Sequence, residues 1–261
     1  MEDLNLRQKK HFDSIASDYH KYRKLKSHTS FKKLTWNFFF KKNSRIFENL
    51  PQKITVLEPM CGFFEGYQIL NSKFKNISSY IGFDYSSEVV NFCKKNYSDL
   101  SIEEADIYKF KTDKSFNFGI LIGGLHHVSN DIETAIKNIS KYYENNAYFI
   151  NLEPTHEYSL IKLIRNFIYK KNSFFDEKTE SGIELKTLNK FFEKNGFKLV
   201  TNHRIGYLGY IFFYNPDAFK IFSKLPSYLI HIFFFLDYII SIVPILKKLS
   251  FATISLYIKA K

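Results

Sequence analysis

The stretch ITVLEPMCGFFEG, from Ile54 to Gly66, decides the fold class of this chain. Its first half is a short apolar run that ends at Glu58, which is typical of a buried strand. Gly62 then marks a turn into a segment with helical character. A strand–turn–helix corner of this kind is typical of a cofactor loop in an α/β sheet. Because only two glycines are present, the kind of cofactor has to be argued from the residues that follow.

After this corner, short apolar runs alternate with segments of helical periodicity, the pattern of a largely parallel α/β sheet. In NDIETAIKNIS, Ile132, Ala135, Ile136 and Ile139 recur at helical spacing and would cover one face of the sheet. The predicted strands span 54–58, 79–84, 101–105, 116–122, 147–152 and 197–203, and the predicted helices span 65–73, 87–96, 132–144 and 185–194. We therefore predict an α/β fold with a mostly parallel sheet and helices on both faces.

Further segments flank this core. Residues 8–50 are predicted to form two helices, with Asp13 or Ser14 as the cap of the first, and residues 251–260 are predicted to form a last strand. The chain then divides into an N-terminal helical lid (1–50), a cofactor-binding core (51–205), an apolar helical insert or cap (206–250) and the closing strand of the core sheet (251–261).

The insert contains LPSYLIHIFFFLDYIISIVPIL, from Leu225 to Leu246, which is long enough to suggest a membrane span. His231, Asp237 and two prolines interrupt it, so a clean span is not favoured. A buried helical cap and an interfacial element that touches a membrane both stay open. Lysines flank this apolar stretch and suit the second interpretation: Lys220, Lys224, Lys247 and Lys248.

The bulk composition indicates a globular protein of the reducing cytosol. Hydrophobic residues make up 45% of the 261 residues and charged residues 25%. The net charge of +12 comes mostly from scattered lysine pairs, which indicates a solvated surface rather than a nucleic-acid site. The two cysteines lack a metal-type spacing, so no metal is expected, and the N-terminus lacks the apolar core of a signal peptide. We expect a cytoplasmic protein, with membrane association left open.

Acidic and Gly-rich features end four consecutive predicted strands. Glu58 ends the first strand, Asp84 the second and Asp106 follows the third, while ILIGGLHHV ends the fourth. In open α/β sheets ligands bind at the carboxyl ends of strands, so these features are expected to meet. An aspartate at the second strand can accept hydrogen bonds from both ribose hydroxyls, and Asp106 can accept one from an adenine amine.

The loop itself argues against a pyrophosphate. In the pattern G-x-G-x-x-G, Met60 and Glu65 would take the first and third glycine positions, and a carboxylate near phosphates is unfavourable. Glu58 beside the turn suits a ligand with positive charge. S-adenosylmethionine (SAM), which carries a sulfonium and an ammonium and no phosphate, is such a ligand.

On these residues the chain resembles the class I SAM-dependent methyltransferases, of the group with small-molecule or glycan-type acceptors. The resemblance covers roughly residues 12–200 and rests on FDSIASDYHKYR, VLEPMCGFFEG, GFDYSSEVVNFCKKN, ADIYKF, the region from FNFGILIGGLHHV onward, and AYFINLEP. It implies a Rossmann-like sheet of seven strands with an antiparallel last strand. The insert at 206–250 and the segment after the fifth strand would then lie over the active-site edge.

The resemblance also implies roles for individual residues. On the methionine and ribose side of SAM, Glu58 and Gly62 would line the site, Gly123 would lie near the methionine end, and Asp84 would bind the ribose hydroxyls. On the adenine side, Tyr85 would flank the ring, and Asp106 and the backbone of Ile107 would bind its edge. Tyr19 would close over the cofactor. The chain departs from the family pattern at Met60 and Phe64, where glycine is common, and at Asn117, where aspartate is common.

For a hydroxyl acceptor a base near the carboxyl edge of the sheet is needed, and His126 and Glu153 are the candidates we favour. His127 is expected to pack against the core, and His11, His20 and His28 to lie on the surface. We expect methyl transfer, as O-methylation, to a small-molecule, sugar or lipid-linked acceptor, for example in surface-glycan synthesis. The alternatives are an RNA methyltransferase that uses the basic surface and a degenerate, non-catalytic SAM-binding protein. A dehydrogenase is least favoured.

Overall fold

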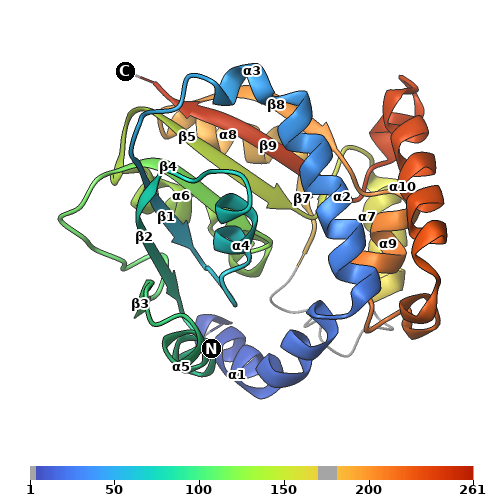
Figure 1. Ribbon diagram of the computed structural model, residues 1–261, viewed down its shortest axis with the longest axis horizontal. Coiled ribbons are helices and arrows are strands. Elements are labelled where there is room, and N and C mark those ends of the chain that lie inside the picture. Colours follow the sequence, from blue (N-terminus) through green and yellow to red (C-terminus); the bar gives the residue numbers. More distant parts are fainter. Residues whose placement is uncertain (1–3, 170–180, 261) are drawn as a thin grey trace.

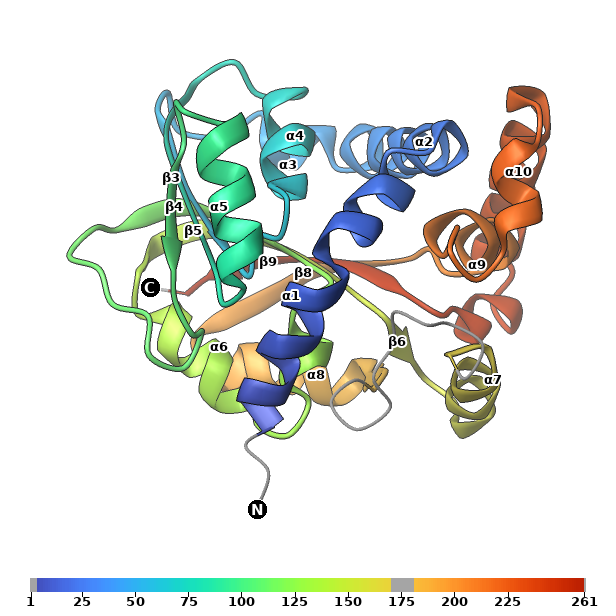
Figure 2. The same ribbon diagram turned by 90° about the horizontal axis from the view of Figure 1, so that it is seen from below.

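The computed structural model describes residues 4–169 and 181–260, which form one seven-stranded sheet with helices on both faces (Figures 1 and 2). The strand order is β3 (Ser101–Glu104), β2 (Ile77–Asp84), β1 (Ile54–Pro59), β4 (Phe116–Ile122), β5 (Tyr143–Glu153), β9 (Thr253–Lys259) and β8 (Phe197–Arg204). β9 is antiparallel to both of its neighbours, while the pairs from β3 to β5 are parallel. The Rossmann-like α/β prediction, including the antiparallel last strand, is therefore confirmed.

The order in which successive strands are added to the sheet reverses beside β1. From β1 the chain runs outward through β2 to β3, then crosses back to place β4 on the other side of β1. Ligands of open α/β sheets bind outside the carboxyl ends of strands at such a switch point. The loops after β1 and β4 therefore border the expected site.

Two apolar layers hold the sheet between its helices. On one face, Val56 and Phe118 belong to the cluster under α2 (Lys26–Lys42), α4 (Glu65–Asn71) and α5 (Ser87–Asn96). On the other face, Leu57 and Phe149 pack with α6 (Ile132–Ser140) and α8 (Leu185–Lys194), as Figure 2 shows. Parallel strands buried on both faces need such continuous apolar sequences, and β1 and β4 supply them.

The N-terminal helices are α1 (Leu4–Arg23), α2 and the short α3 (Ser44–Phe47). α1 crosses the carboxyl edge of the sheet, below β1 and β2 in Figure 1. The prediction that Asp13 or Ser14 starts this helix is wrong, because nothing before them breaks the helix. Asp13 instead lies within α1, and its carboxylate accepts a hydrogen bond from the Ser86 hydroxyl at the start of α5. This bond joins the lid to the core.

The insert is helical, with α9 (Leu208–Tyr214), η2 (Lys220–Lys224), α10 (Ser227–Ile242) and η3 (Leu246–Leu249). α9 and α10 pack on α2, with the rings of Phe31 and Phe213 5.4 Å apart and those of Phe38 and Phe234 6.1 Å apart. The buried Asp237 carboxylate accepts hydrogen bonds from the backbone N–H of Gly209 (2.9 Å) and Tyr210 (3.2 Å). Within the described part of the chain, no helix is both long enough and apolar enough to cross a membrane.

A third group of elements follows β5. The short strands β6 (Thr155–His156) and β7 (Ile183–Glu184) pair in parallel, and α7 (Ser159–Tyr169) lies beside them at the end of the molecule that carries α9 and α10 (Figure 2). The predicted helix over 132–144 is too long, because Tyr143 already belongs to β5. The last residues of the segment expected over the active-site edge, 170–175, lie outside the described residues.

Candidate functional site

The loop after β1 has an unusual backbone. Met60, Gly62 and Phe64 all have positive φ angles, 51°, 50° and 58°. This left-handed region costs a non-glycine residue roughly 1–2 kcal/mol. The loop thus keeps a glycine-type conformation at two positions that are not glycine.

Glycines on neighbouring elements make room for these two side chains. The Phe64 ring is fully buried over Gly82 of β2, where an added Cβ would lie 2.4 Å from the ring. The Met60 side chain lies against Gly124, where an added Cβ would lie 2.9 Å from the Met60 Cβ. Each bulky residue in the loop is therefore matched by a glycine opposite, and ring burial offsets the backbone cost.

Glu58 lies beneath this loop. Its carboxylate accepts hydrogen bonds from the N–H of Gly66 (2.7 Å), the N–H of Tyr67 (3.2 Å) and the hydroxyl of Tyr80 (2.6 Å). Burial raises the pKa of Glu58 to about 8, and these three donors oppose the rise. The structure thus places Glu58 outside the cavity that it was expected to line, where its carboxylate positions the start of α4.

One cavity lies between α1 and the carboxyl ends of the strands, and we call it the lid cavity. Seven of the eight predicted cofactor residues line it: Tyr19, Gly62, Asp84, Tyr85, Asp106, Ile107 and Gly123. The structure thereby brings together residues from α1 and from the ends of β1, β2, β3 and β4. No residue of 206–250 lines it.

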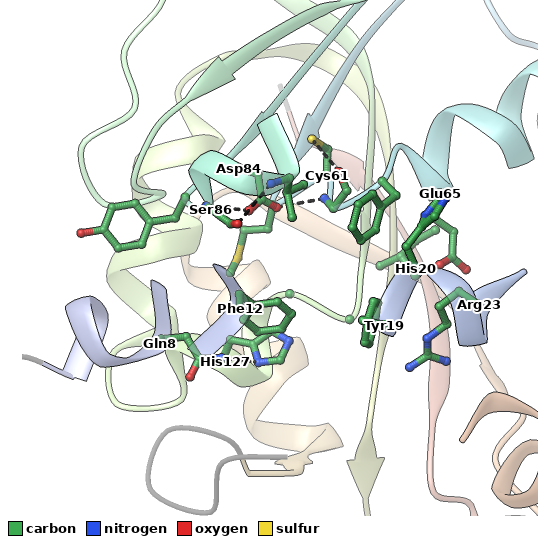
Figure 3. A pocket seen from close by; sticks show the side chains of 18 of the residues that line it. Gln8, Phe12, Tyr19, His20, Arg23, Cys61, Glu65, Asp84, Ser86 and His127 are labelled. Atoms are coloured by element: carbon green, nitrogen blue, oxygen red, sulfur yellow. Dashed lines mark hydrogen bonds between the residues drawn. The ribbon is translucent and has the colours of Figure 1, made fainter. Parts of the chain in front are cut away.

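Asp84 is the central acid of the lid cavity (Figure 3). One carboxylate oxygen accepts from the N–H of Gly62 (2.9 Å) and the other from the N–H of Ser86 (3.0 Å). Burial raises the pKa of Asp84, while these backbone donors oppose the rise. Each carboxylate oxygen can accept a further bond, so the group can hold a vicinal diol.

Two glycines leave space for a ligand at the cavity wall. A Cβ added at Gly62 would meet no atom within 4 Å, and one at Gly123 would meet only His126, at 3.7 Å. By contrast, Gly66 and Gly82 are closely packed by protein atoms. At Gly62 and Gly123 a bound molecule can therefore approach the backbone directly.

The lid contributes one face of α1 to the cavity. Phe12, Tyr19 and Arg23 recur at i, i+7 and i+11 and line the cavity; in Figure 3 the Phe12 ring lies below Asp84, while the Arg23 guanidinium points away from it. The Arg23 guanidinium lies 4.6 Å from the centroid of the Tyr19 ring. Sequence reasoning found only Tyr19, because the misplaced helix start hid this stripe.

His20 also lines the lid cavity. Its ring packs against Phe63 (4.5 Å) and Phe92 (4.4 Å), and burial, with a smaller contribution from Lys24, lowers its pKa. The expected surface position of His20 is therefore wrong.

The side of the cavity near α2 is rich in cations. Arg23, Lys24 and Lys32 line it, and the Lys32 ammonium pairs with the Glu65 carboxylate at 3.2 Å. Asp217 also attracts Arg23, so three cations face two acids, and the remaining positive charge makes that side suited to a ligand with an anionic group.

The predicted catalytic pair lies behind the cavity wall. His126 Nδ1 and a Glu153 carboxylate oxygen are 2.9 Å apart, but neither residue lines the cavity. The fully buried Glu153 also accepts from the N–H of Gly124 (3.0 Å) and Leu125 (2.8 Å), and burial raises its pKa to about 7. This geometry fits residues that hold the turn after β4, rather than residues that touch a substrate.

His127, expected to pack against the core, is the neighbour that reaches the cavity. Its Nδ1 lies 2.9 Å from Gln8 Nε2, and its ring meets Phe12 edge-on at 4.7 Å. His28, expected on the surface, is fully buried, with Nδ1 2.9 Å from the carbonyl oxygen of Phe213. Burial lowers the pKa of His28 to about 3.

The fold and the site together define a class of protein, and comparison with known families agrees. Residues 50–203, more than half of the chain, match a family model described as a methyltransferase domain. The chain therefore belongs to this methyltransferase family. Among curated protein sequences, none matches the chain.

Solved structures show the same fold at low sequence identity. A candidate sarcosine dimethylglycine methyltransferase from Galdieria sulphuraria has a TM-score of 0.63 and 10% identity, with 95% of this chain and 98% of that chain covered. The methyltransferase candidate in complex with the Trm112 methyltransferase activator of Haloferax volcanii has a TM-score of 0.60 and 13% identity, with 96% and 98% covered. The cyclopropane synthase MmaA2 of Mycobacterium tuberculosis has a TM-score of 0.56 and 13% identity, with 82% and 80% covered.

Methyltransferases of this family use SAM, and the lid cavity fits it. The carboxylates of Asp84 and Asp106 would bind the ribose and adenine, and the open backbone at Gly62 and Gly123 leaves space for the methionine part. Tyr19 of α1 would cover it.

Proposed function

We propose that this SAM-dependent methyltransferase methylates a hydroxyl group of a small-molecule, sugar or lipid-linked acceptor. The observation that supports it best is the lid cavity, in which Asp84, Asp106 and the open Gly62 and Gly123 backbone share one space with a cationic side. An acceptor with a phosphate or carboxylate would complement Arg23 and its neighbouring lysines.

A lipid-linked acceptor is the member of this set that we favour. α9 and α10 carry much of the apolar surface and pack on α2, which also supplies Lys32 to the lid cavity. An acceptor held at a membrane by its lipid would therefore have a short route to the site. Both cysteines are free thiols, which suits a reducing compartment.

The chain's contribution to the chemistry is alignment and exclusion of water. Bound SAM supplies an activated methyl group, so the enzyme has to hold the acceptor oxygen in line with it. The aromatic lid residues Phe12 and Tyr19 close the cavity on the side of α1 and would keep water from the reacting atoms.

We propose His127 as the base that takes the proton from the acceptor hydroxyl. It lines the cavity on the turn after β4, and its Nδ1 lies 2.9 Å from the side-chain amide of Gln8. With the amide oxygen of Gln8 turned to accept from Nδ1–H, the lone pair of Nε2 can take the proton. His126 and Glu153 are then positioning residues, because their contacts fix the backbone of this turn.

Thermal stabilisation by S-adenosylhomocysteine tests the cofactor site. We expect the wild-type melting temperature to rise with the ligand and the rise to be lost in Asp84→Ala. Asp113→Ala removes an exposed aspartate away from the cavity and is the matched control. A wild type that shows no shift would refute a working cofactor site and favour the degenerate, non-catalytic alternative.

Labelled methyl transfer from SAM into separated lipid, sugar and RNA fractions tests the acceptor. We expect label in a lipid-linked or sugar fraction and its loss in His127→Gln. Label in RNA alone would instead establish the RNA methyltransferase alternative.

A further inference from the structure

α10 presents an apolar stripe to solvent. Tyr228, Ile232, Phe235, Ile239 and Ile242 follow the spacing i, i+4, i+7, i+11 and i+14, and all are exposed; Phe235 is 58% exposed. The opposite side of the helix packs on α2 and α9 and is apolar too. A helix that is apolar all round is typical of a fully buried position, and this one is half uncovered.

α7 buries Ile161 and Arg165 and exposes other apolar residues. Arg165 is buried, and its guanidinium donates to the backbone carbonyls of Thr155 and Phe251. Leu160 and Leu163, in contrast, point outward, and Leu163 is 67% exposed. The helix is thus anchored by its arginine with its leucines outside.

These two faces lie at the same end of the molecule. Figures 1 and 2 both place α7, α9 and α10 together, away from β2 and β3. Ile245, next to η3, is 78% exposed. We call this set the outer apolar face: Leu160, Leu163, Ile164, Tyr228, Ile232, Phe235, Ile239, Ile242 and Ile245.

Most of the charges near the outer apolar face are positive; among the described residues, the acids beside α7 are Glu157, which is paired with Arg204, and the exposed Glu184. Lys162, Lys220, Lys224 and Lys248 are exposed. In the described residues 158–169 and 206–250 the only acids are Asp237, which is buried, and Asp217, which is half-buried and attracted to Arg23. A second copy of the chain would bring like charges together, whereas an anionic bilayer complements both the apolar stripe and its lysines.

We propose that the outer apolar face docks this protein on the surface of an anionic lipid bilayer, with α10 lying in the plane of the interface. A 16-residue helix is about 24 Å long, too short to span but sufficient to lie flat among the headgroups. Docking goes beyond methyl transfer and stands on residues that do not line the lid cavity.

Vesicle flotation with the full chain tests the proposal. We expect the wild type to float with phosphatidylcholine vesicles that contain phosphatidylglycerol and to bind pure phosphatidylcholine at least about tenfold more weakly. Ile232→Ser with Phe235→Ser should abolish flotation on both, and Val200→Ser, at an exposed site on β8, should not. Lys224→Gln with Lys248→Gln should remove the preference for anionic vesicles, and the exposed Lys198→Gln should keep it.

Several outcomes would overturn the proposal. They are no flotation with anionic vesicles, equal binding to both compositions, and flotation of the serine variant at the wild-type level. A wild-type dimer in light scattering that the serine variant dissociates would assign the face to a second copy. S-adenosylhomocysteine binding measured on the same variants separates the two hypotheses, because docking can fail while cofactor binding persists, and the reverse.

Discussion

Phe64 makes two opposed contributions to stability, one from its backbone and one from its ring. Its left-handed backbone is unfavourable, and its fully buried ring between Tyr80 (5.9 Å) and Tyr97 (5.4 Å) is favourable. Removing a buried Phe ring costs roughly 3–5 kcal/mol, more than the strain. The native loop therefore depends on the ring for its stability.

Phe64→Ala and Phe64→Gly separate these two energies. We expect both variants to be destabilised, but the glycine variant to be more stable than the alanine variant by about 1 kcal/mol, because glycine tolerates the positive φ. Denaturant unfolding of both variants measures the difference. An alanine variant at least as stable as the glycine variant would show that the loop relaxes to another conformation.

The buried His28 makes the stability of the folded state depend on pH. Its pKa is lowered to about 3 by burial, whereas an exposed histidine in the unfolded chain titrates near 6.5. As pH falls below about 6.5, His28 is protonated in the unfolded chain but stays neutral in the folded chain, so the free energy of unfolding falls. The loss attributable to His28 between about pH 7 and pH 5 is about 2 kcal/mol.

His28→Asn should remove that part of the pH dependence, measured as unfolding free energies at the two pH values. His156 and His203, whose pKa values are also lowered by burial to about 4, should keep a residual slope. His231→Asn, at an exposed position, is the matched control for the substitution itself. An unaltered slope in His28→Asn would mean that His28 is protonated in the folded protein.

At the scale of elements, polar contacts along α1 join it to the core, among them Gln8 with His127, Lys9 with Glu104 and Asp13 with Ser86. The Asp13 carboxylate accepts from the Ser86 hydroxyl, and Ser86 is also the N-cap of α5, accepting from the N–H of Val89 at 3.2 Å. One serine therefore serves both the lid and the helix beside Asp84. The position of the lid is coupled to the cofactor side of the sheet through this residue.

Asp13→Ala should loosen the lid. We expect a loss of about 1 kcal/mol of stability, faster amide hydrogen exchange in α1, and weaker binding of S-adenosylhomocysteine. Asp18→Ala, at an exposed position of the same helix, is the matched control. Equal exchange in both variants would show that the other contacts of α1, such as the ion pair of Lys9 with Glu104, hold it without Asp13.

The elements also show what the sequence could predict. β4, α5 and α8 have the predicted bounds, because their periodicity and end signals are local. Asp84 and Asp106 were predicted at the site since strand ends meet at one edge. Glu58 and Glu153 lie outside the cavity and accept hydrogen bonds from backbone N–H groups. These contacts could not be predicted, because only the folded chain brings those N–H groups within reach of the two carboxylates. The burial of His28 depends on α9, almost 200 residues away.

At the scale of the whole molecule, the lid cavity links parts of the chain that are distant in sequence. A bound ligand would touch α1, the loop after β1 and the turn after β4 at once. Stabilisation by a ligand should therefore be shared by these segments and not by the insert, which contributes no residue to the lining.

Hydrogen exchange with and without S-adenosylhomocysteine measures this distribution. We expect protection in residues 8–24, 60–65 and 122–128, and unchanged exchange in α10. Protection in α10 equal to that in α1 would contradict it and would indicate that the insert closes over the ligand.

The match between the loop and its glycines has a consequence for evolutionary change. A larger residue at Gly82 would meet Phe64 first and then Cys61 at 3.0 Å, and one at Gly124 would meet Met60 first and then Leu121 at 3.0 Å. The effect of a substitution at either glycine should therefore depend on the residue in the loop, and each pair is epistatic. Substitutions scored one at a time would report Gly82 as constrained, although the atoms that constrain it belong to Phe64 and Cys61.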